Sequence, residues 1–168
     1  MSRFFKVTAV LVVVVAVLSA FTVPDTLQPP KGVSSTLYFD GVCNLCDGFI
    51  NFVADHDHAM TVKFGAIQKH KEYLDSIKAP SDLSTVVLVQ GNKFYTQSEA
   101  ILRVLALLGE PYRSLSAASI IPAPVRNYVY GAVAKYRYKI FGSVDKCREP
   151  TKAFRKRFLE YKEEGSPF

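Results

Sequence analysis

Two cysteines separated by two residues, Cys43 and Cys46, constrain this chain more than any other feature of its sequence. Residues 36–39 before them are rich in β-branched and aromatic side chains and predict a strand, which the turn dipeptide Asp40-Gly41 ends. The residues that follow have the apolar spacing of a helix face, at Phe49, Ile50, Phe52 and Val53. Unpaired N–H groups and the dipole of a helix N-terminus stabilise a thiolate. A CxxC motif at such a strand-to-helix turn is therefore typical of thiol-disulfide exchange.

Other interpretations of the CxxC motif have less support. A zinc site usually needs a second CxxC or an HxxxH pair. The remaining candidates here are scattered: Cys147, His56, His58 and His70. A structural disulfide would rarely span two residues, and the Asp-Gly turn argues against two inert buried thiols. We therefore expect a redox site with no metal and no cofactor.

The rest of the chain supplies the context that a redox CxxC needs. Patterns of apolar residues predict a strand at 61–67, a short helix at 68–78, strands at 85–89 and 93–95 and a helix after the capping box at 96–99. Gly91-Asn92 predicts a hairpin between the last two strands. The order β-α-β-α-β-β-α is that of an α/β thioredoxin-like domain, with the CxxC in the first βα turn.

A helical extension is predicted after this domain. Pro122 opens a helix that Gly142 ends, and an apolar stripe runs along it at Val125, Tyr128, Val129, Ala132, Val133, Tyr136 and Ile140. Basic residues alternate with tyrosines there, a pattern that also occurs in single-stranded nucleic-acid sites. Without an RNP-like strand motif, and at a net charge of +6, a solvated face on a packing helix is the better interpretation. We expect no nucleic-acid partner, a monomer, and a charged terminal helix at 152–164 that docks on the body.

The first twenty residues predict a targeting or anchoring segment. Arg3 and Lys6 precede an apolar run to Ala20, and the small pair Ser19-Ala20 offers a cleavage site, as in a secretory signal peptide. Extended to Val23, the run reaches the lower limit for spanning a bilayer, so a membrane anchor is the alternative. Residues 18–21, LSAF, also resemble the cleavage context of bipartite plastid presequences. The predicted units are thus 1–20, a linker or transit segment at 21–35, and the domain at 36–164.

Several motifs in order resemble the DCC family, named for its DxxCxxC motif. They are DGVCNLC at 40–46, SEAIL at 98–102, Tyr130, the RYRxFG-like run RYKIFG at 137–142 and Cys147. The resemblance covers about residues 36–150 and implies a thioredoxin-like thiol-disulfide oxidoreductase. It gives Arg137 and Tyr138 a place near the CxxC or a role in binding an anionic substrate group. The thioredoxin cis-proline is missing, because Ser84-Thr85 occupies its position and Pro80 comes too early.

Roles for the site residues follow. We expect Cys43 to be exposed and to attack, and Cys46 to be buried and to resolve the mixed disulfide. Asp40 is either a general base for Cys46 or a turn former. Cys147 is a loop residue, a second resolving thiol or a zinc ligand. The expected substrate is a protein or small-molecule thiol or disulfide, and the alternative function is a non-catalytic module that binds a metal or a partner protein.

Overall fold

One mixed sheet forms the centre of the molecule. The computed structural model describes residues 27, 33–143 and 155–159. In these residues the sheet has the order β2-β1-β3-β4, with β1 paired in parallel to β2 and antiparallel to β3, and β3 antiparallel to β4. The strands are β1 (Ser35–Phe39), β2 (Val62–Ala66), β3 (Val87–Gln90) and β4 (Lys93–Thr96).

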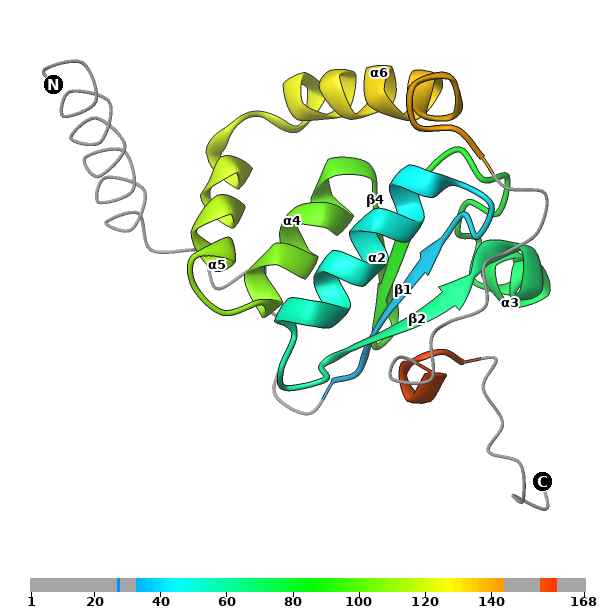
Figure 1. The fold of residues 1–168 in the computed structure, drawn as a ribbon, viewed down its shortest axis with the longest axis horizontal. Helices are drawn as coiled ribbons and strands as arrows, with labels where there is room; N and C mark the ends of the chain where they lie inside the picture. Colours follow the sequence, from blue (N-terminus) through cyan, green and yellow to red (C-terminus); the bar gives the residue numbers. More distant parts are fainter. Residues whose placement is uncertain (1–26, 28–32, 144–154, 160–168) are drawn as a thin grey trace, which may run out of the picture.

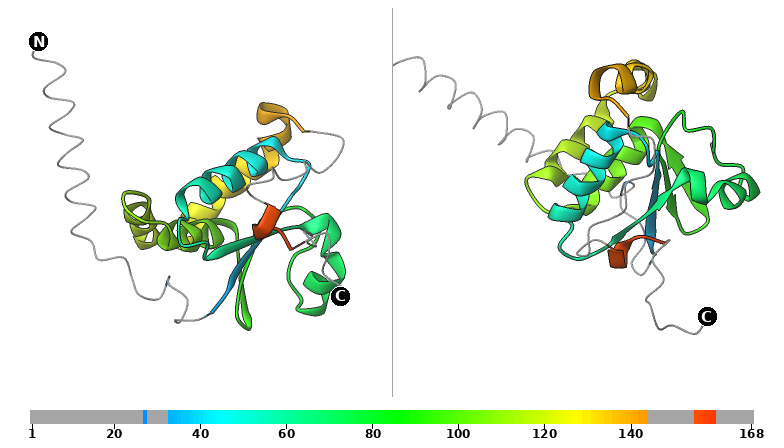
Figure 2. Two further views of the ribbon diagram at one scale, coloured as in Figure 1. Left: turned by 60° about the horizontal axis from the view of Figure 1, so that its bottom comes forward. Right: turned by 45° about the vertical axis from the view of Figure 1, so that its right-hand side comes forward.

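Helices cover both faces of this sheet (Figure 1). They are α2 (Asn44–His56), α3 (Lys71–Ser76), α4 (Gln97–Leu107), α5 (Tyr112–Leu115) and α6 (Ala123–Phe141), with short 3-10 segments η2 (Ile67–Lys69), η3 (Ser116–Ile120) and η4 (Arg155–Arg157). Figure 2 shows α2 and α4 on one side of the sheet and α3 on the other. The predicted order β-α-β-α-β-β-α and its helical extension are confirmed, and the fold is thioredoxin-like.

Alternation along the strands builds two apolar layers. Leu37 and Phe39 of β1 pack with Ile50 and Val53 of α2 on one face. Tyr38 faces the opposite layer, which includes Leu74 of α3. Because successive strand residues point to opposite faces, a continuous apolar run such as that in β3 is buried on both sides, as its sequence predicted.

Two local predictions at α4 and α6 are wrong. The helix begins after Thr96 as predicted, but Thr96 makes no side-chain cap hydrogen bond. The Gln97 N–H donates to Thr85 Oγ1, and Glu99 pairs with Arg103 and Arg126. The apolar stripe of α6 is not buried, and Tyr128 and Ile140 are 82% and 67% exposed. This helix lies across the ends of α2 and α4 (Figure 1), so only one side of it can contact the body.

The C-terminal segment lies against the edge of β2. Phe158 forms a parallel bridge with Phe64, and the Leu159 N–H donates to the Phe64 carbonyl at 2.9 Å. Of the helix predicted at 152–164, the described residues form only the turn η4 and this bridge. The edge of a strand offers unpaired backbone N–H and C=O groups. Pairing with this edge, in place of a continued helix, accounts for the bridge at Phe158.

Other predicted segments lie largely outside the described residues, namely 1–20, most of 21–35 and Cys147. In the part of the chain that the structure describes, no helix has both the length and the apolar character needed to cross a membrane.

Candidate active site

Cys43 is the N-cap residue of α2. Its backbone is extended, and its Sγ accepts a hydrogen bond from the Cys46 N–H at 3.4 Å. The preceding turn holds it there: the Cys43 N–H donates to the Asp40 carbonyl, and the Val42 N–H donates to Asp40 Oδ1 at 3.2 Å. Both cysteines are free thiols. A sulfur that accepts from the first turn of a helix is well placed to carry negative charge.

The exposures of the two sulfurs are the reverse of the prediction. Cys43 is buried, with 1% of its surface exposed, whereas Cys46 is half-buried. The cause is the end of α6: the Asn44 N–H donates to the Gly142 carbonyl, and Ser143 forms a bridge with Cys43. This close approach also explains Gly142, whose φ is +76° and whose missing Cβ would lie 3.2 Å from Asn44 Nδ2.

The structure brings Arg137 and Tyr138 together with Asp40, ninety-seven and ninety-eight positions away in the chain. Asp40 is 3% exposed. Its Oδ2 accepts from Arg137 Nη2 at 3.3 Å and from the Tyr138 hydroxyl. The turn-forming interpretation of Asp40 is thus supported by its contact with Val42 N–H, and the same buried carboxylate is the centre of a polar cluster.

Gln68 belongs to this cluster and was missed in the sequence. Its Nε2 donates to Asp40 Oδ1 at 2.8 Å, and its Oε1 accepts from the Gly41 N–H at 3.2 Å. Gln68 follows β2, which runs parallel to β1, so both strands deliver their next residues to the same edge of the sheet. That position just after a predicted strand was the available signal.

The surroundings of the site raise the pKa of two groups, the Cys46 thiol and the Tyr138 hydroxyl. Burial raises the pKa of the Cys46 thiol well above its usual range, and the hydrogen bond and charge of Cys43 and the charge of Asp40 raise it further, while Arg137 opposes them. Burial and the hydrogen bond to Asp40 also raise the pKa of Tyr138. Cys46 and Tyr138 are therefore both protonated at neutral pH.

Side chains of α6 hold the loop where thioredoxins have their cis-proline. The Tyr130 hydroxyl accepts from the Val86 N–H at 3.1 Å and from Thr85 Oγ1 at 3.1 Å. Arg137 Nη2 donates to the Leu83 carbonyl at 2.6 Å, and Leu83 has a φ of +65°. This loop thus has its conformation fixed from α6, which gives a structural role to Tyr130.

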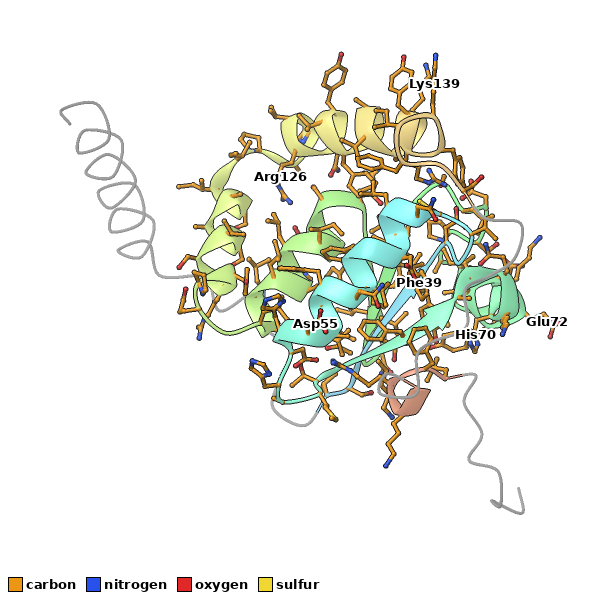
Figure 3. All side chains as sticks on the ribbon, viewed as in Figure 1. Phe39, Asp55, His70, Glu72, Arg126 and Lys139 are labelled. Atoms are coloured by element: carbon orange, nitrogen blue, oxygen red, sulfur yellow. The ribbon has the colours of Figure 1, made fainter. Side chains whose placement is uncertain are left out.

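A pocket of about 240 Å³ lies between this loop, α2, α4 and α6, with Cys46 in its wall. Cys43 is not among its lining residues. Phe39 also lines the pocket. Figure 3 shows Phe39 between the sheet and α2, whereas Lys139 points away from the body. The sulfur that a ligand in this pocket would meet is therefore Cys46.

A metal site receives no geometric support from the described ranges 33–143 and 155–159, where no three His, Cys, Asp or Glu side chains gather. The candidate ligand Cys147 lies outside those ranges.

Comparison with known proteins agrees with the CxxC geometry. A family model described as DCC1-like thiol-disulfide oxidoreductase matches residues 37–143. The chain belongs to this family. This DCC1-like chain is 41% identical over 115 residues to a chloroplastic DCC family protein of Arabidopsis thaliana. The aligned region is 66% of this chain and 67% of that protein. It is also 36% identical over 126 residues to the uncharacterized protein YuxK of Bacillus subtilis. The aligned region is 73% of this chain and 92% of that protein. No solved structure matches it significantly.

Proposed function

We propose that this chain catalyses thiol-disulfide exchange through Cys43 and Cys46. The observation that carries the proposal is the hydrogen bond from the Cys46 N–H to Cys43 Sγ at the start of α2. It gives one sulfur a donor that stabilises the thiolate, which is both the attacking species and the leaving group of exchange. The family supports the same chemistry.

The reaction passes two electrons between the pair and a substrate. In one direction the dithiol becomes a disulfide, while a substrate disulfide gains two electrons and two protons and becomes two thiols. In the other direction the enzyme disulfide oxidises two substrate thiols. Each direction passes through a mixed disulfide between one enzyme sulfur and one substrate sulfur.

Asp40 supports this chemistry through its charge. It helps to raise the pKa of Cys46, so Cys46 keeps its proton until exchange requires the thiolate. Arg137 and Tyr138 orient the carboxylate by donating to Oδ2. Direct transfer of the Cys46 proton to Asp40 stays a prediction, as does contact of Arg137 and Tyr138 with substrate.

A redox titration of the full chain tests this function. In glutathione buffers of stepped potential, Cys43 and Cys46 should become oxidised together, as one disulfide that dithiothreitol reverses. Cys43→Ser and Cys46→Ser should each abolish catalytic exchange, whereas Cys147→Ser should leave it within about tenfold, or roughly 1.4 kcal/mol of barrier. Independent oxidation of the two thiols would overturn the proposal, and stoichiometric zinc on protected thiols would favour the non-catalytic binding module.

For location we propose a plastid, reached by a bipartite presequence in which residues 1–20 are removed first and 21–35 serve as the transit segment. The support is the LSAF sequence at 18–21 and a relative described as chloroplastic. N-terminal sequencing of the native protein tests it. A mature start close to the domain at 36 is expected, a start near residue 21 would indicate the secretory route instead, and an intact Met1 in membranes would indicate an anchor.

A further inference from the structure

The pocket beside Cys46 is apolar and small. Its wall combines α2, the 83–86 loop, α4 and α6, and eight of its fourteen lining side chains are hydrocarbon, among them Leu45, Phe49, Val86, Ile101, Val133 and Ala134. Sites for drug-sized ligands usually measure roughly 300–1,000 Å³, and this one measures about 240 Å³. The space suits one bulky side chain rather than a cofactor.

The two charged residues that line the pocket, Arg137 and Asp40, neutralise each other, so a substrate meets no net charge there. Arg137 and Asp40 form an ion pair at 3.3 Å, and Arg137 Nη2 also donates to the Leu83 carbonyl and the Tyr138 hydroxyl, while the buried Arg137 Nε has no partner among the described residues. A charged group entering the pocket would lose its hydration without gaining a counter-ion. An apolar group would gain free energy in proportion to the surface it buries.

The different access to the two cysteines decides which sulfur meets the substrate. Cys46 lines the pocket, whereas Cys43 is buried behind Gly142 and Ser143. In the oxidised pair, attack on Cys46 expels Cys43 as a thiolate that accepts the Cys46 N–H bond. Attack on Cys43 would expel Cys46, whose raised pKa makes it a poor leaving group. Access therefore selects Cys46 for the first attack, and Cys43 is the better first leaving group. Cys46 leaves once by either route, so its raised pKa slows one step of the cycle without choosing between the sulfurs.

We propose that the pocket binds a bulky apolar side chain next to the cysteine of a substrate protein, and that this cysteine joins Cys46. The proposal rests on the exchange function above. A substrate thiolate forms an S–S bond to Cys46 while the Cys43–Cys46 bond breaks and Cys43 leaves with the electron pair. A second substrate thiolate then attacks the first substrate sulfur and expels Cys46, which takes up a proton. The substrate loses two electrons and the enzyme pair gains them.

Two reduced peptides of equal thiol chemistry test the pocket. They are acetyl-Leu-Cys-Leu-amide and acetyl-Gln-Cys-Gln-amide, whose flanking residues are uncharged. The measured quantity is the second-order rate constant for reduction of the oxidised full chain. We expect the leucine peptide to react at least about tenfold faster, because even one methylene group in an apolar pocket is worth roughly 10–200-fold.

A matched pair of variants connects this preference to the pocket. Ala134→Phe adds a ring on the pocket side of α6, and Ala132→Phe adds the same ring on its exposed side. Ala134→Phe should reduce the preference below about threefold, while Ala132→Phe should leave it at about tenfold. The serine analogue acetyl-Leu-Ser-Leu-amide should inhibit wild type competitively, a measurement that needs no variant.

The outcomes separate the two proposals. Equal rates for both peptides, or loss of the preference in Ala132→Phe alone, would overturn the pocket while the exchange function stands. Failure of wild type to react with these peptides and with glutathione would overturn both.

The attacked sulfur is identified by acid quench. Oxidised wild type is mixed with one equivalent of the leucine peptide, quenched at low pH, blocked with maleimide and digested. The peptide should be found on Cys46 with maleimide on Cys43. The opposite arrangement would overturn the assignment and restore Cys43 as the sulfur that contacts substrate.

Discussion

Replacement of Arg157 by methionine should destabilise the domain far more than loss of an ordinary surface ion pair. Its guanidinium pairs with Asp57, and the two side chains are 7% and 1% exposed. Arg157 also donates to the carbonyls of Ala54 and Val62 at 3.0 Å each. Methionine keeps much of the apolar stem but leaves the Asp57 carboxylate buried without a counter-charge.

The expected size follows from what Asp57 retains. Removal of one partner from a buried pair costs about 3–5 kcal/mol. Asp57 still accepts from the N–H and hydroxyl of Thr61 and from the Val62 N–H, at 2.8–3.1 Å, and these donors partly stabilise the charge. We therefore expect the lower end, about 3 kcal/mol, which corresponds to a fall in Tm of about 6–12 °C for a chain of this size.

Urea unfolding followed by far-UV circular dichroism measures the loss, which should appear as a lower midpoint at an unchanged m value. The matched control is Arg126→Met, whose side chain is 13% exposed and whose partner Glu99 is 30% exposed. Glu99 keeps its pair with Arg103 and is not left buried without a counter-charge, so this variant should cost no more than about 1 kcal/mol. The double variant Asp57→Asn with Arg157→Met should recover part of the loss. Equal destabilisation by Arg157→Met and Arg126→Met would refute the docking of the C-terminal segment through this pair.

Three further changes have defined outcomes. Because burial raises the pKa of Cys46, the folded chain keeps a proton that the unfolded chain releases above about pH 8.5. The unfolding free energy should therefore fall as the pH rises, by up to about 1.4 kcal/mol per pH unit. Urea titrations from pH 8 to 10 measure this fall, and Cys46→Ala should remove the part of it that comes from Cys46. Tyr130→Phe deprives the Val86 N–H of its acceptor and should cost about 1–3 kcal/mol in the same titrations. Asp40→Asn removes a charge that raises the pKa of Cys46, so alkylation of Cys46, located by mass spectrometry, should begin at lower pH; a shift to higher pH would contradict this assignment.

The C-terminal segment shows where a family match and a folding unit differ. The match ends at residue 143, yet Arg157 and Phe158 pack against β2 and its neighbours. A chain that ends at 143 would lose both contacts together with the edge pairing to Phe64.

The sequence by itself determined the strand, turn and helix around the CxxC and the order of the elements. These features depend on local properties: the period of apolar residues, the Asp-Gly turn and the Gly-Asn hairpin. It also determined that β3 would be buried on both faces, because a run without polar residues has no side to present to water. Family resemblance directed attention to Arg137 and Tyr138 without specifying their contacts.

Only the tertiary structure decided the chemistry around the two sulfurs. Cys43 is buried by residues of the α6 end, almost a hundred positions away, and Asp40 meets Arg137 and Tyr138 across a similar separation. The spacing within a CxxC motif sets the distance between its cysteines along the helix, but access to each sulfur depends on which distant segment packs over it. The exposed stripe of α6 has the same cause: periodicity places apolar residues on one side of a helix, and the packing of other elements determines whether that side is covered.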